Sequence, residues 1–168
     1  DPATLTLLTE FGRHTADVAN VIPPQKAGAI AAKAGVADRT GWCPVEPVAF
    51  ESVLQRGIHV LGDAAIMGAM PKSAFAANAQ AKVCAAAIVE LLAGRAPQQP
   101  LLINTCYSLL AADYGISIAG VYRPDKGLLT DVPGAGGVSA LDAVGGLRGQ
   151  EALYAASWFR AIAAETFG

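Results

Sequence analysis

Two short segments in the middle of the chain carry residues suited to binding a nucleotide-like cofactor. Gly62 and Asp63 follow the apolar run 57–61, and an acid at the end of a buried strand is well placed to bind ribose or ribityl hydroxyls. Lys72 and Ser73 stand at the expected start of a long helix, where free N–H groups and the helix dipole favour an anion. Each signal is weak alone, since Gly-Asp is also a common turn, Ser73 also caps a helix and Lys72 is also a solvated residue there. Together they indicate a cofactor site.

The cysteines Cys43, Cys84 and Cys106 are odd in number and show no Cys-x-x-Cys spacing. They cannot form a self-contained disulfide framework, and with two scattered histidines they make no zinc pattern, so we predict no metal site. Cys106 has polar neighbours in 104–108, which makes its thiol the candidate for reactivity, although a structural role stays open for it. Cys84 among alanines and Cys43 beside a proline favour buried packing.

The overall composition excludes several classes of function. Lys and Arg number 12 against 14 Asp and Glu, a formal net charge of −2, so no basic surplus exists to bind nucleic acid. The longest apolar run, near 83–93, is about half of the ~20 residues that a membrane span needs, which predicts no span. Apolar residues make up 53% and charged ones 15%, so we expect part of the surface to be covered.

The pattern of apolar residues and turn formers predicts the elements that position these residues. Between 36 and 56 and again between 124 and 149 the pattern is irregular, and we predict loops there. The run 57–61 has the form of a strand in a buried parallel sheet. The other predicted elements are a hairpin of 4–11 with 16–22, helices over 25–34, 73–93 and 150–166, and a second hairpin of 101–110 with 114–122.

Taken together, these segments resemble the flavoprotein subunit of flavocytochrome c, the sulfide dehydrogenase. The Gly-Asp pair is shared with the wider glutathione-reductase-like flavoproteins, whereas Gly-Trp-Cys-Pro at 41–44 and Asn-Thr-Cys-Tyr-Ser at 104–108 are specific. The resemblance rests on residues 21–25, 41–45, 57–63, 70–73, 104–108, 114–117 and 166–168.

The resemblance implies an α+β fragment of a larger α/β flavoprotein, of the FAD-dependent pyridine-nucleotide-disulfide-oxidoreductase type. Residues 1–22 then correspond to the last hairpin of a central NAD-like domain and 23–95 to the returning half of the FAD-binding domain. Residues 96–168 correspond to a C-terminal domain that borders the flavin and a cytochrome partner. The first FAD strand and its glycine-rich turn are expected upstream of Asp1.

The resemblance also implies a function: oxidation of sulfide through a redox disulfide and FAD, with electrons passed to a c-type cytochrome subunit in the periplasm. Cys106 would be one half of that disulfide, with its partner in the missing N-terminal part of the flavoprotein. The fragment alone is therefore expected to be inactive.

Five cofactor-binding residues follow from the same resemblance. Asp63, with Gly62, would bind the ribityl or pyrophosphate region of FAD. Lys72 and Ser73, at the helix start, would face the pyrimidine edge of the flavin, and Trp158 would be an aromatic residue near it.

Two alternatives remain open. A non-catalytic module that binds a c-type cytochrome fits the low charge and the expected covered surfaces equally well. A fragment of a related sulfide:quinone reductase is less favoured, because those enzymes end in a basic amphipathic membrane anchor and residues 150–168 contain Arg160 as their only base.

Overall fold

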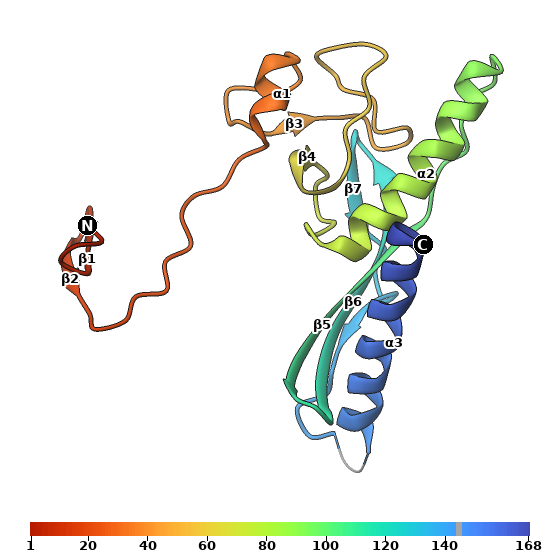
Figure 1. Cartoon of the computed structure of the whole chain (residues 1–168). Coiled ribbons are helices and arrows are strands. Elements are labelled where there is room, and N and C mark those ends of the chain that lie inside the picture. The colour runs from red at the N-terminus through yellow and green to blue at the C-terminus, as the bar shows by residue number, and fades with distance from the viewer. Residues whose placement is uncertain (144–145) are drawn as a thin grey trace.

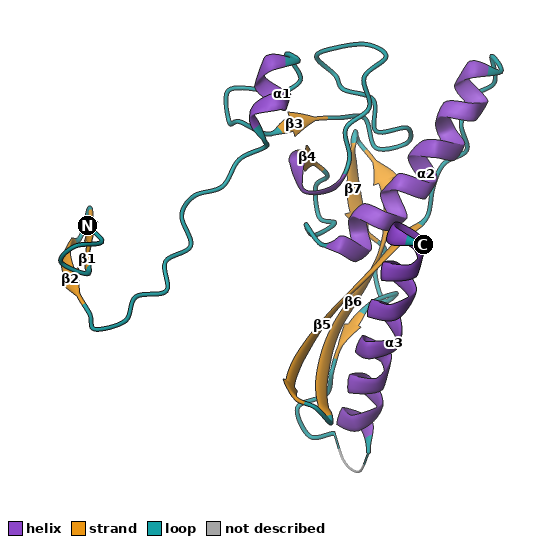
Figure 2. Cartoon of the chain, viewed as in Figure 1, coloured by secondary structure: helices purple, strands orange, loops and turns teal. Residues whose placement is uncertain are grey.

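The computed structural model describes residues 1–143 and 146–168, and its main body is an antiparallel sheet with a long helix on one face (Figure 1). The sheet contains β5 (Leu102–Ala111), β6 (Tyr114–Asp125) and β7 (Leu128–Asp131) in that order, with β8 (Gly137–Val138) also paired to β6. Helix α3 (Leu147–Phe167) runs along this sheet, as Figure 2 shows. The described chain is thus α+β, with helices and mixed small sheets.

The second hairpin is confirmed and is longer than predicted. Its register pairs Cys106 with Ile118 and Gly115 with Leu109. Since side chains alternate across a strand, Cys106 and Ile118 lie on one face and Gly115 lies on the other, against α3. The predicted loop 124–149 is wrong in part, because it contains β7 and β8 and the start of α3; Val144 and Gly145 in it lie outside the described residues.

Helix α3 confirms the predicted C-terminal helix, and its small residues rather than its large ones are buried. Leu153 and Phe159 are exposed, at 63% and 66%, whereas Ala152 and Ala155 are buried. The reason is the close approach of α3 to the glycine at 115: a Cβ there would lie 2.6 Å from the backbone nitrogen of Ala152. Small side chains therefore face the sheet, and the large ones point away from it.

Helix α2 (Ala74–Leu92) confirms the predicted central helix together with its N-cap, Ser73. Its first part packs in the core through Ala76, Cys84 and Ala87, while Leu92 near its end is 84% exposed. By length and composition α2 is the one helix among the described residues that could cross a membrane. Core helices meet the same criterion, so this finding has little weight against the prediction of no span.

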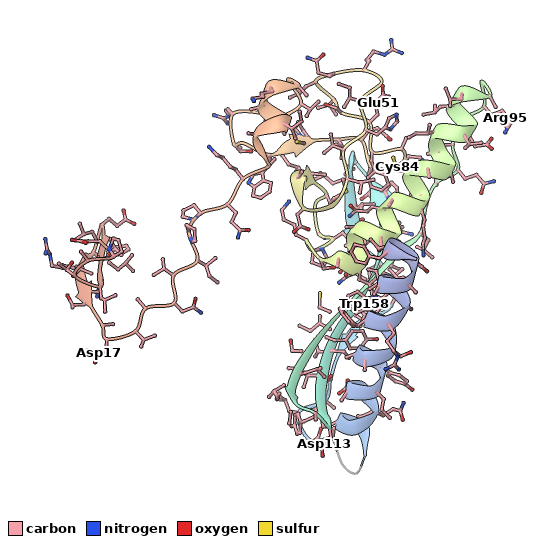
Figure 3. All side chains as sticks on the ribbon, viewed as in Figure 1. Asp17, Glu51, Cys84, Arg95, Asp113 and Trp158 are labelled. Carbon is pink, nitrogen blue, oxygen red and sulfur yellow. The ribbon has the colours of Figure 1, made fainter. Side chains whose placement is uncertain are left out.

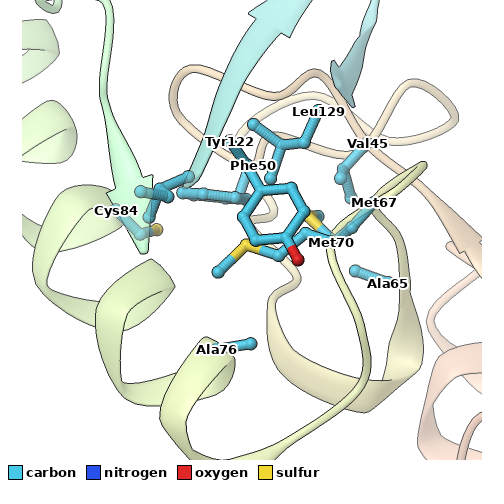
Figure 4. Close-up of a cluster of buried hydrophobic side chains, with 10 residues drawn as sticks. Val45, Phe50, Ala65, Met67, Met70, Ala76, Cys84, Tyr122 and Leu129 are labelled. Carbon is cyan, nitrogen blue, oxygen red and sulfur yellow. The ribbon is translucent and has the colours of Figure 1, made fainter. Parts of the chain in front are cut away.

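The hydrophobic core lies between α2, the end of the β5–β6 hairpin and the loops of residues 45–70 (Figure 4). Phe50, Leu102 and Leu129 are its largest fully buried apolar side chains. Backbone hydrogen bonds from Leu129 N to Met67 O (3.0 Å) and from Ala69 N to Leu129 O (2.9 Å) join β7 to this loop region. The core thereby joins α2 and the loops of residues 45–70 to the β5–β6–β7 sheet.

The predicted strand 57–61 is wrong. Its backbone forms an isolated bridge, between Glu51 and His59, and Ile58 is 39% exposed. A strand needs a neighbouring strand along its whole length. Among the described residues, the backbone of 57–61 bonds instead to the short irregular segment 50–52. Short strands β3 (Cys43–Pro44) and β4 (Ala65–Ile66) pair in parallel nearby.

The N-terminal segment forms a small hairpin that lies apart from the body (Figure 1). Its strands are β1 (Thr6–Thr9) and β2 (Gly12–Thr15), so the turn lies at residues 10–11 and both strands are shorter than predicted. Residues 16–22, predicted as the second strand, have no regular structure and lead into helix α1 (Ala29–Lys33), which covers only part of the predicted 25–34 helix.

Candidate functional site

The Gly62–Asp63 pair forms the start of a single 3₁₀ turn, Gly62–Ala64, beside the first half of α2. Gly62 has a φ of +67°, in the left-handed region that favours glycine, and a Cβ on it would lie 3.3 Å from the Cβ of Ala77. The turn therefore lies directly against α2. Asp63 is exposed, and among the described residues no hydrogen-bond donor or cation pairs with its carboxylate.

Lys72 connects this turn to the start of α2. Its Nζ donates to the backbone carbonyl of Asp63 and, at 2.9 Å, to that of Ala65, and it lies 4.1 Å from the ring centroid of Trp42. Burial lowers the pKa of Lys72, and the nearby Asp63 charge opposes that shift. Lys72 thus places positive charge between the turn and α2, with two of its three donors bound to backbone carbonyls.

Ser73 links the start of α2 to β5. Its Oγ accepts a hydrogen bond from Ala76 N (3.0 Å), which caps the helix, and donates to Asn104 Oδ1 (2.5 Å). Asn104 is 2% exposed and its Nδ2 lies 3.3 Å from the sulfur of Cys106. A chain of hydrogen bonds therefore runs from the helix start to the Cys106 thiol.

The three cysteines differ in their surroundings. Cys106 is half-buried on the face of the β5–β6 hairpin that α3 does not cover, where its neighbours across the sheet include the exposed Ile118 and Val138. Cys43 and Cys84 are buried, and burial raises the pKa of both thiols. Since a reacting thiol must be reached by its substrate, the more accessible Cys106 is the cysteine best placed for chemistry.

Trp158 lies on α3, beside the start of α2 (Figure 3). Its ring stacks on Phe75 of α2, with centroids 5.7 Å apart, and lies 6.2 Å from Tyr107. Tyr107 and Cys106 are neighbours on β5 and point to opposite faces. The structure thus brings Gly62, Asp63, Lys72, Ser73 and Cys106 around the first turn of α2, and it places Trp158 beside that turn but away from the Cys106 face.

Residues 98–167 match the family described as flavocytochrome c sulphide dehydrogenase, flavin-binding. This segment is therefore similar to the flavin-binding domain of that family. It contains β5, β6, β7, β8 and α3, and with them Cys106 and Trp158. The cofactor of such a domain is a flavin, consistent with FAD.

Residues that adjoin the matched segment carry groups that would fit a flavin nucleotide, although they lie outside that segment. Asp63 presents an unpaired, exposed carboxylate on a turn that packs on α2, and α2 presents the free N–H groups of a 19-residue helix. An open groove of about 510 Å³ is lined in part by Trp42, Met67 and Lys72, and Lys72 connects it to the turn that carries Asp63. The Asp63 carboxylate could accept hydrogen bonds from hydroxyls of a flavin nucleotide. The helix start and Lys72 could bind its anionic part, and Trp42 could contact its aromatic part.

Sequence reasoning missed three residues around the site. Trp42 was part of a recognised motif, but nothing indicated its contact with Lys72. Gln80 is a fully buried amide in an otherwise small and apolar face of α2, and its spacing from Ala76 and Cys84 is a signal that the sequence does contain. The third is Glu151.

Glu151 is buried at the start of α3 and connects this helix to the sheet of the matched segment. Its carboxylate accepts hydrogen bonds from Ser117 (2.9 Å) and Ser139 and forms an ion pair with Arg148 (3.0 Å). The hydrogen bond from Ser139, then those from Ser117 and Arg148, lower the pKa of Glu151 against the opposing effect of burial. The charged form is therefore the one that this domain stabilises.

We expect the stability of the domain to fall in acid for this reason. A carboxyl whose pKa is lower in the folded state stabilises it above the unfolded pKa, and that contribution disappears as the pH falls through the folded value. Glu151→Gln should have a lower Tm than the wild type at pH 7. Between pH 7 and pH 3 its Tm should fall by less than that of the wild type, as measured by thermal unfolding. Glu10→Gln, on the exposed N-terminal hairpin, is the control; an equal acid loss in wild type and Glu151→Gln would contradict the prediction.

Proposed function

We propose that this chain is the C-terminal part of a flavoprotein that oxidises sulfide through a redox disulfide and FAD and delivers electrons to a c-type cytochrome. The observation that carries the proposal is the position of Cys106. It is the most accessible thiol, it lies inside the flavin-binding segment, and its sulfur is linked through Asn104 and Ser73 to the start of α2. The second half of the disulfide belongs to a preceding segment of the same flavoprotein.

The cofactor would be held by the groups around that helix start. Asp63 accepts hydrogen bonds from ribityl or ribose hydroxyls, and Gly62 lets the turn lie close to α2. The N-terminus of α2, capped by Ser73, and the Lys72 ammonium supply positive potential where the reduced cofactor is negative. When bound, the flavin supplies two-electron acceptance and one-electron release.

The sulfur chemistry follows from thiol–disulfide exchange. The hydrosulfide sulfur attacks one sulfur of the disulfide; a new S–S bond forms in a cysteine persulfide, the old S–S bond breaks, and the other cysteine leaves as a thiolate. No electrons are lost in this step. Re-forming the disulfide from this pair releases one sulfur atom at the zero oxidation level, one proton and two electrons.

Asn104 contributes to this step through its amide. Its Nδ2 donates a hydrogen bond to the Cys106 sulfur at 3.3 Å, which holds that sulfur in one position for the exchange step. Its Oδ1 is held by the Ser73 hydroxyl, which fixes the orientation of the amide. The same two residues thereby orient the sulfur and cap the helix.

A turnover assay tests the proposal against its alternatives. The complete flavoprotein should reduce an added c-type cytochrome, followed by the haem absorbance, only when sulfide is present, and should show a flavin absorbance band. A colourless protein that binds cytochrome without turnover would favour the non-catalytic module, and activity with a quinone but not with cytochrome would favour the quinone reductase.

A further inference from the structure

Gln80 is the only polar side chain among the buried residues of α2, and both ends of its amide are bound inside the protein. It is 1% exposed. Its Oε1 accepts a hydrogen bond from the backbone N–H of Gly62 at 2.7 Å, and its Nε2 lies 3.5 Å from the sulfur of Met70. The neighbours of Gln80 along the same helix face, Ala76 and Cys84, are small and apolar.

A buried glutamine in such surroundings needs an energetic reason, because an apolar side chain would fill the space without desolvating an amide. Here the reason is Gly62. Its N–H is the first donor of the 3₁₀ turn and has no partner within that turn, and the turn packs directly on α2 at Ala77. Without Gln80, Gly62 would present an unsatisfied donor toward the helix.

We propose that Gln80 is a positioning residue for the flavin site, holding the Gly62–Asp63 turn so that the Asp63 carboxylate faces the cofactor. The inference rests on the proposed role of Asp63 as a ligand of FAD. Gln80 accepts a hydrogen bond from the Gly62 N–H at the start of the turn, and Lys72 donates hydrogen bonds to the carbonyls of Asp63 and Ala65. The turn is therefore held from two sides, with the Asp63 side chain left exposed between them.

Four variants of the complete flavoprotein test this role. Gln80→Met keeps the length and shape of the side chain and removes the acceptor for Gly62. Gln80→Glu keeps an oxygen in the same place. Asp63→Ala removes the proposed ligand, and Cys84→Ala, on the same buried face one turn further along α2, is the control for a general packing defect.

Two measurements are made on each variant: the dissociation constant for FAD, from quenching of flavin fluorescence on titrating the flavin-free protein, and hydrogen exchange of the Gly62 amide without flavin. Gln80→Met should weaken FAD binding about five- to tenfold, the equivalent of one neutral hydrogen bond. It should also speed Gly62 exchange by about tenfold. Gln80→Glu should stay within about twofold of the wild type in both, as should Cys84→Ala even where its Tm falls.

The double variant Asp63→Ala with Gln80→Met separates positioning from packing. If Gln80 acts through Asp63, the double variant should bind FAD about as weakly as Asp63→Ala alone. Additive losses, or Gln80→Met within twofold of the wild type while Asp63→Ala is weakened, would overturn the role of Gln80 and leave the proposed function intact. Normal FAD binding by Asp63→Ala would instead refute the proposed role of Asp63.

Discussion

Cys106→Ser in the complete flavoprotein is expected to lower sulfide-dependent cytochrome reduction by at least about 1,000-fold, the scale of losing a covalent nucleophile. A serine hydroxyl forms neither a disulfide nor a persulfide, so the exchange step with hydrosulfide has no sulfur to attack. The flavin band should remain, because Asn104 can donate to a hydroxyl as it does to the thiol and the cap at Ser73 is unchanged. Steady-state rates followed at the haem, with the flavin absorbance of each preparation, measure both effects.

Cys84→Ala is the matched control for this prediction. Cys84 is 4% exposed in the core cluster, and burial raises the pKa of its thiol. Its loss should leave turnover per bound flavin unchanged, with only a small cost in stability from the cavity. If Cys106→Ser turned over sulfide at the wild-type rate, Cys106 would have no role in the mechanism. The non-catalytic cytochrome-binding module would then be the favoured alternative.

The long elements were predictable because local sequence determines them. Ser73 with the alanine-rich run after it predicted α2 and its cap, and alternation predicted the β5–β6 hairpin. The strand at 57–61 was wrong because a short apolar run becomes a strand only where another strand lies beside it. Residues 50–52 give it a single bridge in the described chain, so the backbone turns into the 3₁₀ turn at Gly62 instead.

The candidate site was predictable residue by residue but not as an arrangement. Motifs indicated Asp63, Ser73 and Cys106, whereas the contacts that connect them run through Asn104 and Gln80, across long stretches of sequence. Such contacts depend on which face of a helix meets which strand. Spacing within one element does not contain that information.

The face of α3 illustrates the same limit. Large apolar residues at helical spacing usually form the buried face of a helix, yet Leu153 and Phe159 of α3 are both exposed. The sheet surface beneath α3 has a glycine at 115, and a helix that approaches a glycine so closely must present alanines. The identity of the buried face is therefore decided by the partner element.

Gly115→Ala is expected to have the largest effect on stability for this reason. A Cβ at residue 115 would lie 2.6 Å from the nitrogen of Ala152 and 2.8 Å from the carbonyl carbon of Glu151, both backbone atoms that no side-chain rotation can move. Helix α3 would have to shift away from β6, at a cost of about 2–3 kcal/mol. The shift would also disturb the stacking of Trp158 with Phe75, so urea unfolding and near-ultraviolet circular dichroism should both change.

Gly149→Ala is the matched control, since residue 149 lies in the first turn of α3, where that helix begins. A Cβ there would lie 3.6 Å from the carbonyl oxygen of Asp113, an ordinary contact, and alanine is favoured over glycine within a helix by about 1 kcal/mol. This variant should be neutral or slightly more stable, with the Trp158 signal unchanged. Unfolding of Gly115→Ala at the same urea concentration as Gly149→Ala would contradict this prediction. It would mean that the close approach of α3 to β6 does not hold Trp158 and Glu151 in place.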